Sequence, residues 1–253
     1  MTLKKKVRSY WNKYPCGTKN IGGKVSKKFF DTIDKRRYKL EPFIEHFAEF
    51  KKWKGRKILE MGCGNGSDLM QFDKNKAIAY GIDFSKKSIK LAKERIKLFD
   101  TKFGLIVGDV ENLPFRNNIF DFVYCWGVLH HTPNYQKSVR EIYRVLKAGG
   151  KFCVMVYHKR SMVCLQLFLR YKLFEPSKNL DEIIALHHES PGTKFFTKND
   201  IIKLFSMFKK LKIQTIVTLY DLRIAKRKYL TFLKYLIPSS LGFFMTIRGE
   251  KNL

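Results

Sequence analysis

The sequence has few acidic residues and lacks the long apolar runs of a membrane-spanning chain. Aspartate and glutamate number 22 against 51 lysines and arginines, which gives a formal net charge of +29. The longest apolar runs, such as residues 162–169, are shorter than the ~18 residues that a membrane-spanning helix needs. Residues 4–6 are lysines, but polar and charged residues follow them instead of an apolar stretch. We therefore expect no signal peptide and a cytoplasmic protein.

Cysteine is scarce and shows no metal-binding spacing. The chain has five cysteines, an odd number, and none of them belongs to a C-x-x-C pair. A disulfide framework ordinarily has an even number of cysteines, and a zinc site ordinarily has C-x-x-C pairs. The sequence therefore predicts reduced thiols and no metal site.

The most informative feature that is present is an apolar run followed by an acid and a glycine-rich turn. Glu60 ends the run, and Gly62, Gly64 and Gly66 follow at every second position. Glycine tolerates positive φ and lets a ligand approach the backbone, so this turn predicts a nucleotide-sized site between a strand and a helix. The spacing is not the G-x-G-x-x-G of dinucleotide folds, and a carboxylate here would repel a pyrophosphate but stabilise an ammonium group. The pattern favours S-adenosylmethionine (SAM) over NAD.

Further apolar segments carry polar side chains where predicted strands end. Residues 77–83 end in Asp83, residues 105–110 contain Asp109, and residues 120–127 form a fourth strand pattern. Open α/β sheets bind ligands at the carboxyl ends of their strands. We therefore expect Asp83 to bind ribose hydroxyls and Asp109 to accept from an adenine amino group.

Four motifs in this order resemble those of class I SAM-dependent methyltransferases, in particular the small-molecule branch that includes the ubiquinone- and menaquinone-biosynthesis type. The motifs are LEMGCGNG at 59–66, GDVENLPF at 108–115, FDFV at 120–123 and RVLKAGG at 144–150. The resemblance implies that Gly62 and Gly64 line the methionine moiety. It places Asp83 at the ribose, and Asp109 with Val110 at the adenine. The full expected cofactor-binding set is Glu60, Gly62, Gly64, Gly66, Asp83, Phe84, Asp109, Val110 and Trp126.

Strand and helix patterns alternate through residue 157. Apolar residues have helical spacing from 85 to 98 and again from 139 to 146, and residues 151–157 predict a fifth strand. This alternation predicts an α/β fold with a doubly wound, seven-stranded, mostly parallel sheet, to which 212–219 and 243–248 add strands. We expect one domain over 1–253. Residues 1–54 would form N-terminal lid helices, 55–157 the SAM-binding core, and 158–253 a helical insert after strand five and the rest of the sheet.

Two histidines follow the fourth predicted strand directly. They are His130 and His131, within the segment WGVLHHT at 126–132. Methyl transfer to an oxygen or to a protonated nitrogen requires a base, and imidazole has a suitable pKa. We expect one of the two to act as the catalytic base, with a structural role for both as the alternative.

The substrate class is less constrained than the cofactor. The segment after strand four favours a small-molecule or lipid-like acceptor. An RNA methyltransferase that uses the basic surface is the alternative, although no base-clamping motif follows strand four and no RNA-binding module is evident. A binding protein without activity is a third hypothesis, and the intact cofactor set argues against it.

The excess positive charge has two interpretations. Lysine is scattered over nearly every segment, which indicates a compositional bias. The basic residues 223–229, followed by the apolar, aromatic residues 230–237, instead resemble a membrane-surface pattern more than an RNA-reading one. If the charge is functional, it predicts peripheral contact with an anionic membrane, with nucleic acid as the less favoured partner. The sequence leaves the oligomeric state open.

Overall fold

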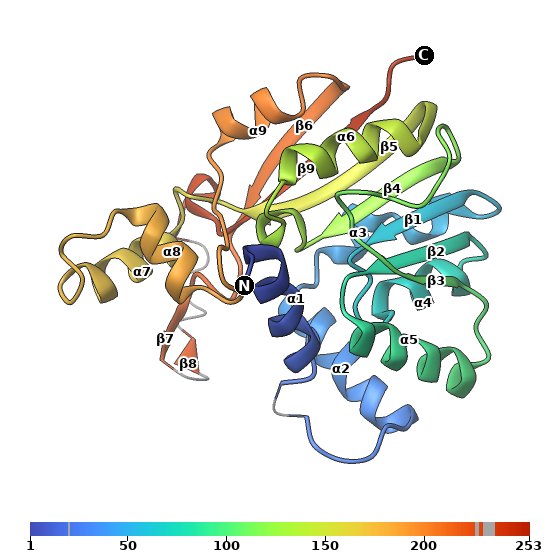
Figure 1. Ribbon diagram of the computed structural model, residues 1–253, viewed down its shortest axis with the longest axis horizontal. Helices are drawn as coiled ribbons and strands as arrows, with labels where there is room; N and C mark the ends of the chain where they lie inside the picture. Colours follow the sequence, from blue (N-terminus) through green and yellow to red (C-terminus); the bar gives the residue numbers. More distant parts are fainter. Residues whose placement is uncertain (20, 226–227, 230–235) are drawn as a thin grey trace.

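A computed structural model describes residues 1–19, 21–225, 228–229 and 236–253. Its centre is a seven-stranded sheet with the strand order β3-β2-β1-β4-β5-β9-β6 (Figure 1). Neighbouring strands from β3 to β5 are parallel, whereas β9 runs antiparallel to both β5 and β6. The strands are β1 Lys57–Met61, β2 Ile78–Asp83, β3 Gly104–Val107, β4 Phe120–Trp126, β5 Leu146–Tyr157, β6 Lys209–Ile216 and β9 Phe244–Glu250. The predicted fold class is confirmed.

Helices cover both faces of this sheet. Those before β4 are α1 Leu3–Lys13, α2 Lys27–Leu40, α3 Ile44–Ala48, the 3₁₀ turn η1 Phe50–Trp53, α4 Ser67–Lys74 and α5 Lys86–Phe99. Those after it are η2 Leu129–His131, α6 Tyr135–Val145, α7 Met162–Lys172, α8 Leu180–His187, α9 Lys198–Leu204 and η4 Ser239–Leu241. A separate two-stranded antiparallel sheet pairs β7 Arg223–Ala225 with β8 Lys228–Tyr229. No helix in the described ranges is both long and apolar enough to cross a bilayer.

Strand β4 shows how the core divides into two layers. Phe122, Tyr124 and Trp126 point to the face that α3, η1 and α4 cover, while Val123 and Cys125 point to the face of α6 and α9. Alternate side chains of a strand lie on opposite faces, and a central parallel strand is buried on both. This explains why β4 reads as a continuous apolar run. Figure 1 shows α6 and α9 together over the β5, β9 and β6 side of the sheet.

Some boundaries differ from those expected. Strand β5 begins at Leu146 instead of 151. The chain stays in the sheet through Gly149, which has a φ of +68°, and the pairing of β5 with β4 shifts register along this stretch. The strand expected at 212–219 is shifted to 209–216. The β7–β8 pair and α8 were not predicted. A capping box of Asn179 and Glu182 begins α8 and is the local signal that could have revealed it.

A buried arginine connects the glycine-rich turn to two helices. Arg95 of α5 is completely buried, and its guanidinium forms two hydrogen bonds with Asp34 of α2, at 2.7 and 3.0 Å. It also donates to the backbone oxygen of Asn65 at 2.9 Å and to that side chain at 2.7 Å. Ser67, which follows the turn, donates to Asp34 at 2.6 Å. These contacts hold the glycine-rich turn against α2 and α5.

We predict that Arg95→Leu destabilises the fold by about 3–5 kcal/mol, because removing one partner leaves the buried Asp34 without its counter-charge. Urea unfolding measures this change. Lys97→Leu, at an exposed position of the same helix, should change stability by less than about 0.5 kcal/mol. Equal unfolding midpoints for the two variants would show that the Arg95 network does not hold the fold.

Candidate active site

A cavity of about 120 Å³ lies at the carboxyl ends of β1, β2 and β4, beneath α1. Seven of the nine predicted cofactor residues line it: Gly62, Gly64, Asp83, Phe84, Asp109, Val110 and Trp126. The parallel strands bring these residues to one edge although they are spread over more than sixty positions of sequence. The structure thus assembles most of the predicted cofactor set around one space.

The glycine-rich turn needs its glycines for two separate reasons. Gly62 has a φ of +75°, and a Cβ there would lie only 2.1 Å from Cγ2 of Val128. Gly64 has a φ of +54°, and its backbone N–H donates to Asp83 Oδ2 at 2.9 Å. Positive φ and close approach are conditions that only glycine meets without strain. The turn therefore leaves backbone exposed to the cavity and ties it to the end of β2.

Asp83 combines a cavity position with a perturbed acidity. Burial raises the pKa of its carboxyl to about 6, although backbone N–H groups of Ser85 and Gly64 donate to it and oppose the shift. A carboxylate at this position can accept hydrogen bonds from a diol such as ribose. Its ability to do so depends on pH near neutrality.

Two predicted cofactor residues lie behind the cavity instead of in its wall. Glu60 is buried, and its Oε2 has no hydrogen-bond partner among the described residues. Burial, followed by the nearby charge of Asp68, raises the pKa of Glu60 well above its ordinary value. Gly66 precedes α4 with a φ of +82° and faces Phe103. The contact of Glu60 with an ammonium group stays a prediction.

Helix α1 forms the roof of the cavity. Lys4 Nζ donates to Asp109 Oδ2 at 2.7 Å and also to Glu111, and Val7 and Trp11 line the cavity from the same helix. At the other end of α1, Ser85 Oγ donates to the backbone oxygen of Trp11 at 3.2 Å. The pairing of Lys4 with the acid expected to bind adenine was not predicted. In the sequence, the lysines at 4–6 resemble only the basic start of a signal peptide.

The two candidate histidines occupy different positions. His131 lines the cavity, and its Nε2 lies 3.0 Å from Glu189 Oε2. Its Nδ1 lies 2.9 Å from Ser190 Oγ. His130 is fully buried behind it, stacked on Tyr157 with ring centroids 3.7 Å apart. The structure therefore brings His131, and not His130, to the wall of the cavity.

The pKa values of His130 and Glu189 are shifted by their surroundings. Burial lowers the pKa of His130 well below its ordinary value, and neither of its ring nitrogens has a hydrogen-bond partner in the described residues. Desolvation opposes ionisation of Glu189, but hydrogen bonds from His131 and Tyr157 outweigh it and hold the pKa of the carboxyl below its usual range. Glu189 contacts the cavity-lining His131 and was not among the predicted site residues. No local motif marks it, since it lies in the loop after α8.

The same three groups are close enough to be considered for a metal. One ligand atom each of His130, His131 and Glu189 lie within 4.8 Å of one another. Both ring nitrogens of His131 already contact protein oxygens, those of Glu189 and Ser190. The arrangement is therefore a hydrogen-bonded imidazole and carboxylate with a second histidine packed behind them.

Comparison with known proteins identifies the family of the chain. The family described as "Methyltransferase domain" matches residues 59–154. The chain is 32% identical over 170 residues to an uncharacterized protein of Methanocaldococcus jannaschii, which covers 66% of this chain and 69% of that protein. It is 30% identical over 175 residues to the demethylmenaquinone methyltransferase of Staphylococcus aureus, covering 60% of this chain and 72% of the relative. The chain belongs to the class I SAM-dependent methyltransferases.

A solved structure shows the same fold for this methyltransferase. The magnesium protoporphyrin IX methyltransferase from Synechocystis, solved with bound SAM, superposes with a TM-score of 0.61 at 16% identity. The match covers 100% of this chain and 98% of that one. SAM is the cofactor of the methyltransferase. The residues present suit it, because the glycine-rich turn leaves the close backbone approach that SAM requires and Asp83 offers an acceptor for its ribose hydroxyls.

We predict that Asp83→Asn weakens SAM binding about ten- to a hundredfold, as expected for loss of hydrogen bonds to a charged acceptor. Because the pKa of Asp83 is about 6, the carboxylate is present above that pH and is lost as pH falls through it. Wild-type affinity should therefore fall between about pH 7 and about pH 5, and the variant should lose this dependence. Calorimetry measures both, with Asp31→Asn on the exposed side of α2 as control. Unchanged affinity in Asp83→Asn, or tighter binding of NAD than of SAM, would contradict the assignment.

Opening of the roof can be tested at Lys4. Lys4→Met removes the contacts of α1 with Asp109 and Glu111, so association and dissociation of S-adenosylhomocysteine should both become about two- to fivefold faster, the scale of a partly exposed ion pair. Stopped-flow displacement measures these rates. Lys5→Met changes the same charge at an exposed position and serves as the control. Identical rates in the two variants would argue that α1 does not limit exchange.

Proposed function

We propose that this methyltransferase transfers the methyl group of SAM to a small-molecule or lipid-like acceptor, and that Glu189 and His131 together take the proton of the acceptor. The observation that carries the proposal is the imidazole of His131, which lines the cofactor cavity and is hydrogen-bonded to the carboxylate of Glu189. Such a pair holds the ring in one orientation and stabilises the imidazolium that forms when it takes a proton. This is the arrangement expected of a general base.

The proton balance is simple. The acceptor's nucleophilic atom forms a bond to the methyl carbon while the bond from that carbon to sulfur breaks, and S-adenosylhomocysteine leaves. The acceptor's proton passes to Nδ1 of neutral His131, where it displaces the contact with Ser190 Oγ, while the Nε2–H stays hydrogen-bonded to Glu189 Oε2. Tyr157 donates to Glu189 Oε2 at 2.9 Å, which keeps the carboxylate in place during the transfer. Alignment by the cavity walls supplies the remainder of the rate enhancement.

The walls of the site support an acceptor with apolar or planar character. Trp126 lines the cavity, and its indole N–H donates to Glu41 Oε2 at 2.8 Å, which fixes the ring. Tyr124 stacks behind Trp126, with ring centroids 5.7 Å apart. The name of the Staphylococcus aureus relative, a demethylmenaquinone methyltransferase, is in keeping with such an acceptor. Neither that name nor that of the Synechocystis enzyme refers to RNA, so methylation of RNA has no specific support.

A cytoplasmic location accompanies this proposal. All five cysteines are unpaired thiols, as is usual for a protein of a reducing compartment.

The acceptor class can be determined by incubating the protein with methyl-labelled SAM and fractionated extract of the source cells. We expect label in the lipid or small-metabolite fraction. Label confined to RNA would overturn the proposal in favour of the alternative substrate. A heat-inactivated sample and a sample with excess S-adenosylhomocysteine control for label that does not depend on this enzyme.

With that acceptor, His131→Ala and Glu189→Gln should each lower turnover, His131→Ala by about 10²–10⁴-fold, because the general base is lost while SAM affinity stays nearly constant. His130→Leu should affect turnover much less, since its ring has no polar partner in the described structure to lose. His187→Gln, on α8 and paired with Glu175, is the matched control. Wild-type turnover in both His131→Ala and Glu189→Gln would mean that transfer depends on proximity alone.

A further inference from the structure

Helix α7 exposes a row of large apolar side chains on its outer surface. Leu165, Leu169 and Leu173 are 48%, 66% and 80% exposed, and the adjoining Phe174 is 78% exposed. Residues spaced by four lie on the same face of a helix. These four side chains are referred to as the α7 patch.

The opposite side of α7 is already used for packing. Val163 and Cys164 are buried in the core, and Leu167 packs against the same cluster. Gln166 donates to the backbone oxygen of Asp221 at 3.2 Å, which fixes α7 against the chain that leads into β7. The helix is therefore anchored without its exposed leucines. An exposed row of apolar side chains of this kind indicates a surface that binds a protein or a membrane.

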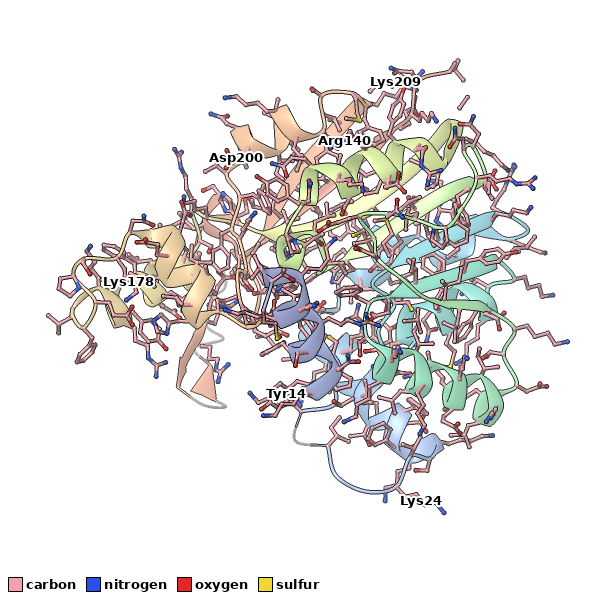
Figure 2. The ribbon with its side chains drawn as sticks, viewed as in Figure 1. Tyr14, Lys24, Arg140, Lys178, Asp200 and Lys209 are labelled. Carbon is pink, nitrogen blue, oxygen red and sulfur yellow. The ribbon has the colours of Figure 1, made fainter. Side chains whose placement is uncertain are left out.

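The charge along α7 itself has one sign. Residues 161–174 contain no acid, and Arg170 and Lys172 lie on the same helix. The next acid along the chain, Glu175, is paired with Lys178 and His187. Figure 2 shows Lys178 at the outer end of the insert that α7 and α8 form, away from the sheet.

A second basic segment begins beside α7. In sequence, residues 223–237 contain five basic residues and no acid: Arg223, Lys226, Arg227, Lys228 and Lys234. The contact of Gln166 with Asp221 places the start of this segment next to the helix, and Figure 1 shows β7 on the same side of the molecule as α7. The membrane contact expected from 223–237 falls largely on 226–227 and 230–235, which lie outside the described residues.

We propose that the α7 patch docks the methyltransferase on an anionic lipid bilayer. The four apolar side chains enter the boundary between headgroups and acyl chains, and the surrounding basic residues meet the anionic headgroups. A second copy of the chain is a poorer occupant, because each copy carries a net charge of +29 and the two would repel. This docking is independent of the proposed acceptor and base, because it requires neither SAM nor a substrate.

Sedimentation of the 253-residue protein with vesicles tests the proposal. Wild type should sediment with mixed phosphatidylserine and phosphatidylcholine vesicles, far less with phosphatidylcholine alone, and less as salt rises. The triple variant Leu169→Gln, Leu173→Gln, Phe174→Gln should bind the mixed vesicles about tenfold more weakly or worse. Ile202→Gln changes an exposed apolar residue of α9 and should bind like wild type. Thermal unfolding confirms that both variants are folded.

Three results would overturn the proposal. One is absence of wild-type binding to the mixed vesicles, and another is equal binding by wild type and the folded triple variant. The third is a wild-type dimer that light scattering shows and that the triple variant abolishes, because the patch would then be an interface between copies. Methyl transfer to a soluble acceptor, measured without vesicles, reports on the proposed function separately.

Discussion

The burial of one guanidinium is the constraint on which the position of the cofactor site depends. A charge as deeply buried as that of Arg95 is tolerated only when counter-charge and hydrogen-bond acceptors surround it. Here the counter-charge comes from Asp34 on α2, and the acceptors include the backbone and side chain of Asn65 within the glycine-rich turn. The turn can therefore adopt its cavity-forming shape only when α2 and α5 are both in place.

The two halves of the active site are built in different ways. The cofactor half depends on local backbone geometry, in which positive φ at Gly62 and Gly64 follows directly from the sequence of the turn. The proposed acceptor half depends on a contact between distant segments, because Glu189 reaches His131 from the loop after α8. A fold with this division can keep its cofactor while the acceptor changes, since fold does not fix substrate.

The scarcity of acids gives the remaining ones defined structural tasks. Asp109 and Glu111 hold the roof helix through Lys4, Asp68 accepts hydrogen bonds from Arg37, and Glu41 fixes Trp126. In a chain with a net charge of +29, such acids are the counter-charges that let basic side chains pack against the sheet. The outer face of α7 carries no acid, so the basic residues of this helix have no counter-charge on the helix itself.

The sequence by itself determined the sheet, the glycine-rich turn and the strand-end residues Asp83 and Asp109, because apolar periodicity and glycine spacing are local properties of the chain. It also indicated two histidines without distinguishing them. Only the tertiary structure decided that His131 lines the cavity and His130 lies behind it, since both follow the same strand and differ by one position. The partners of Arg95, Lys4 and His131 were likewise beyond local patterns, because each contact joins segments far apart in the chain that meet only when the helices and the late loop pack onto the sheet.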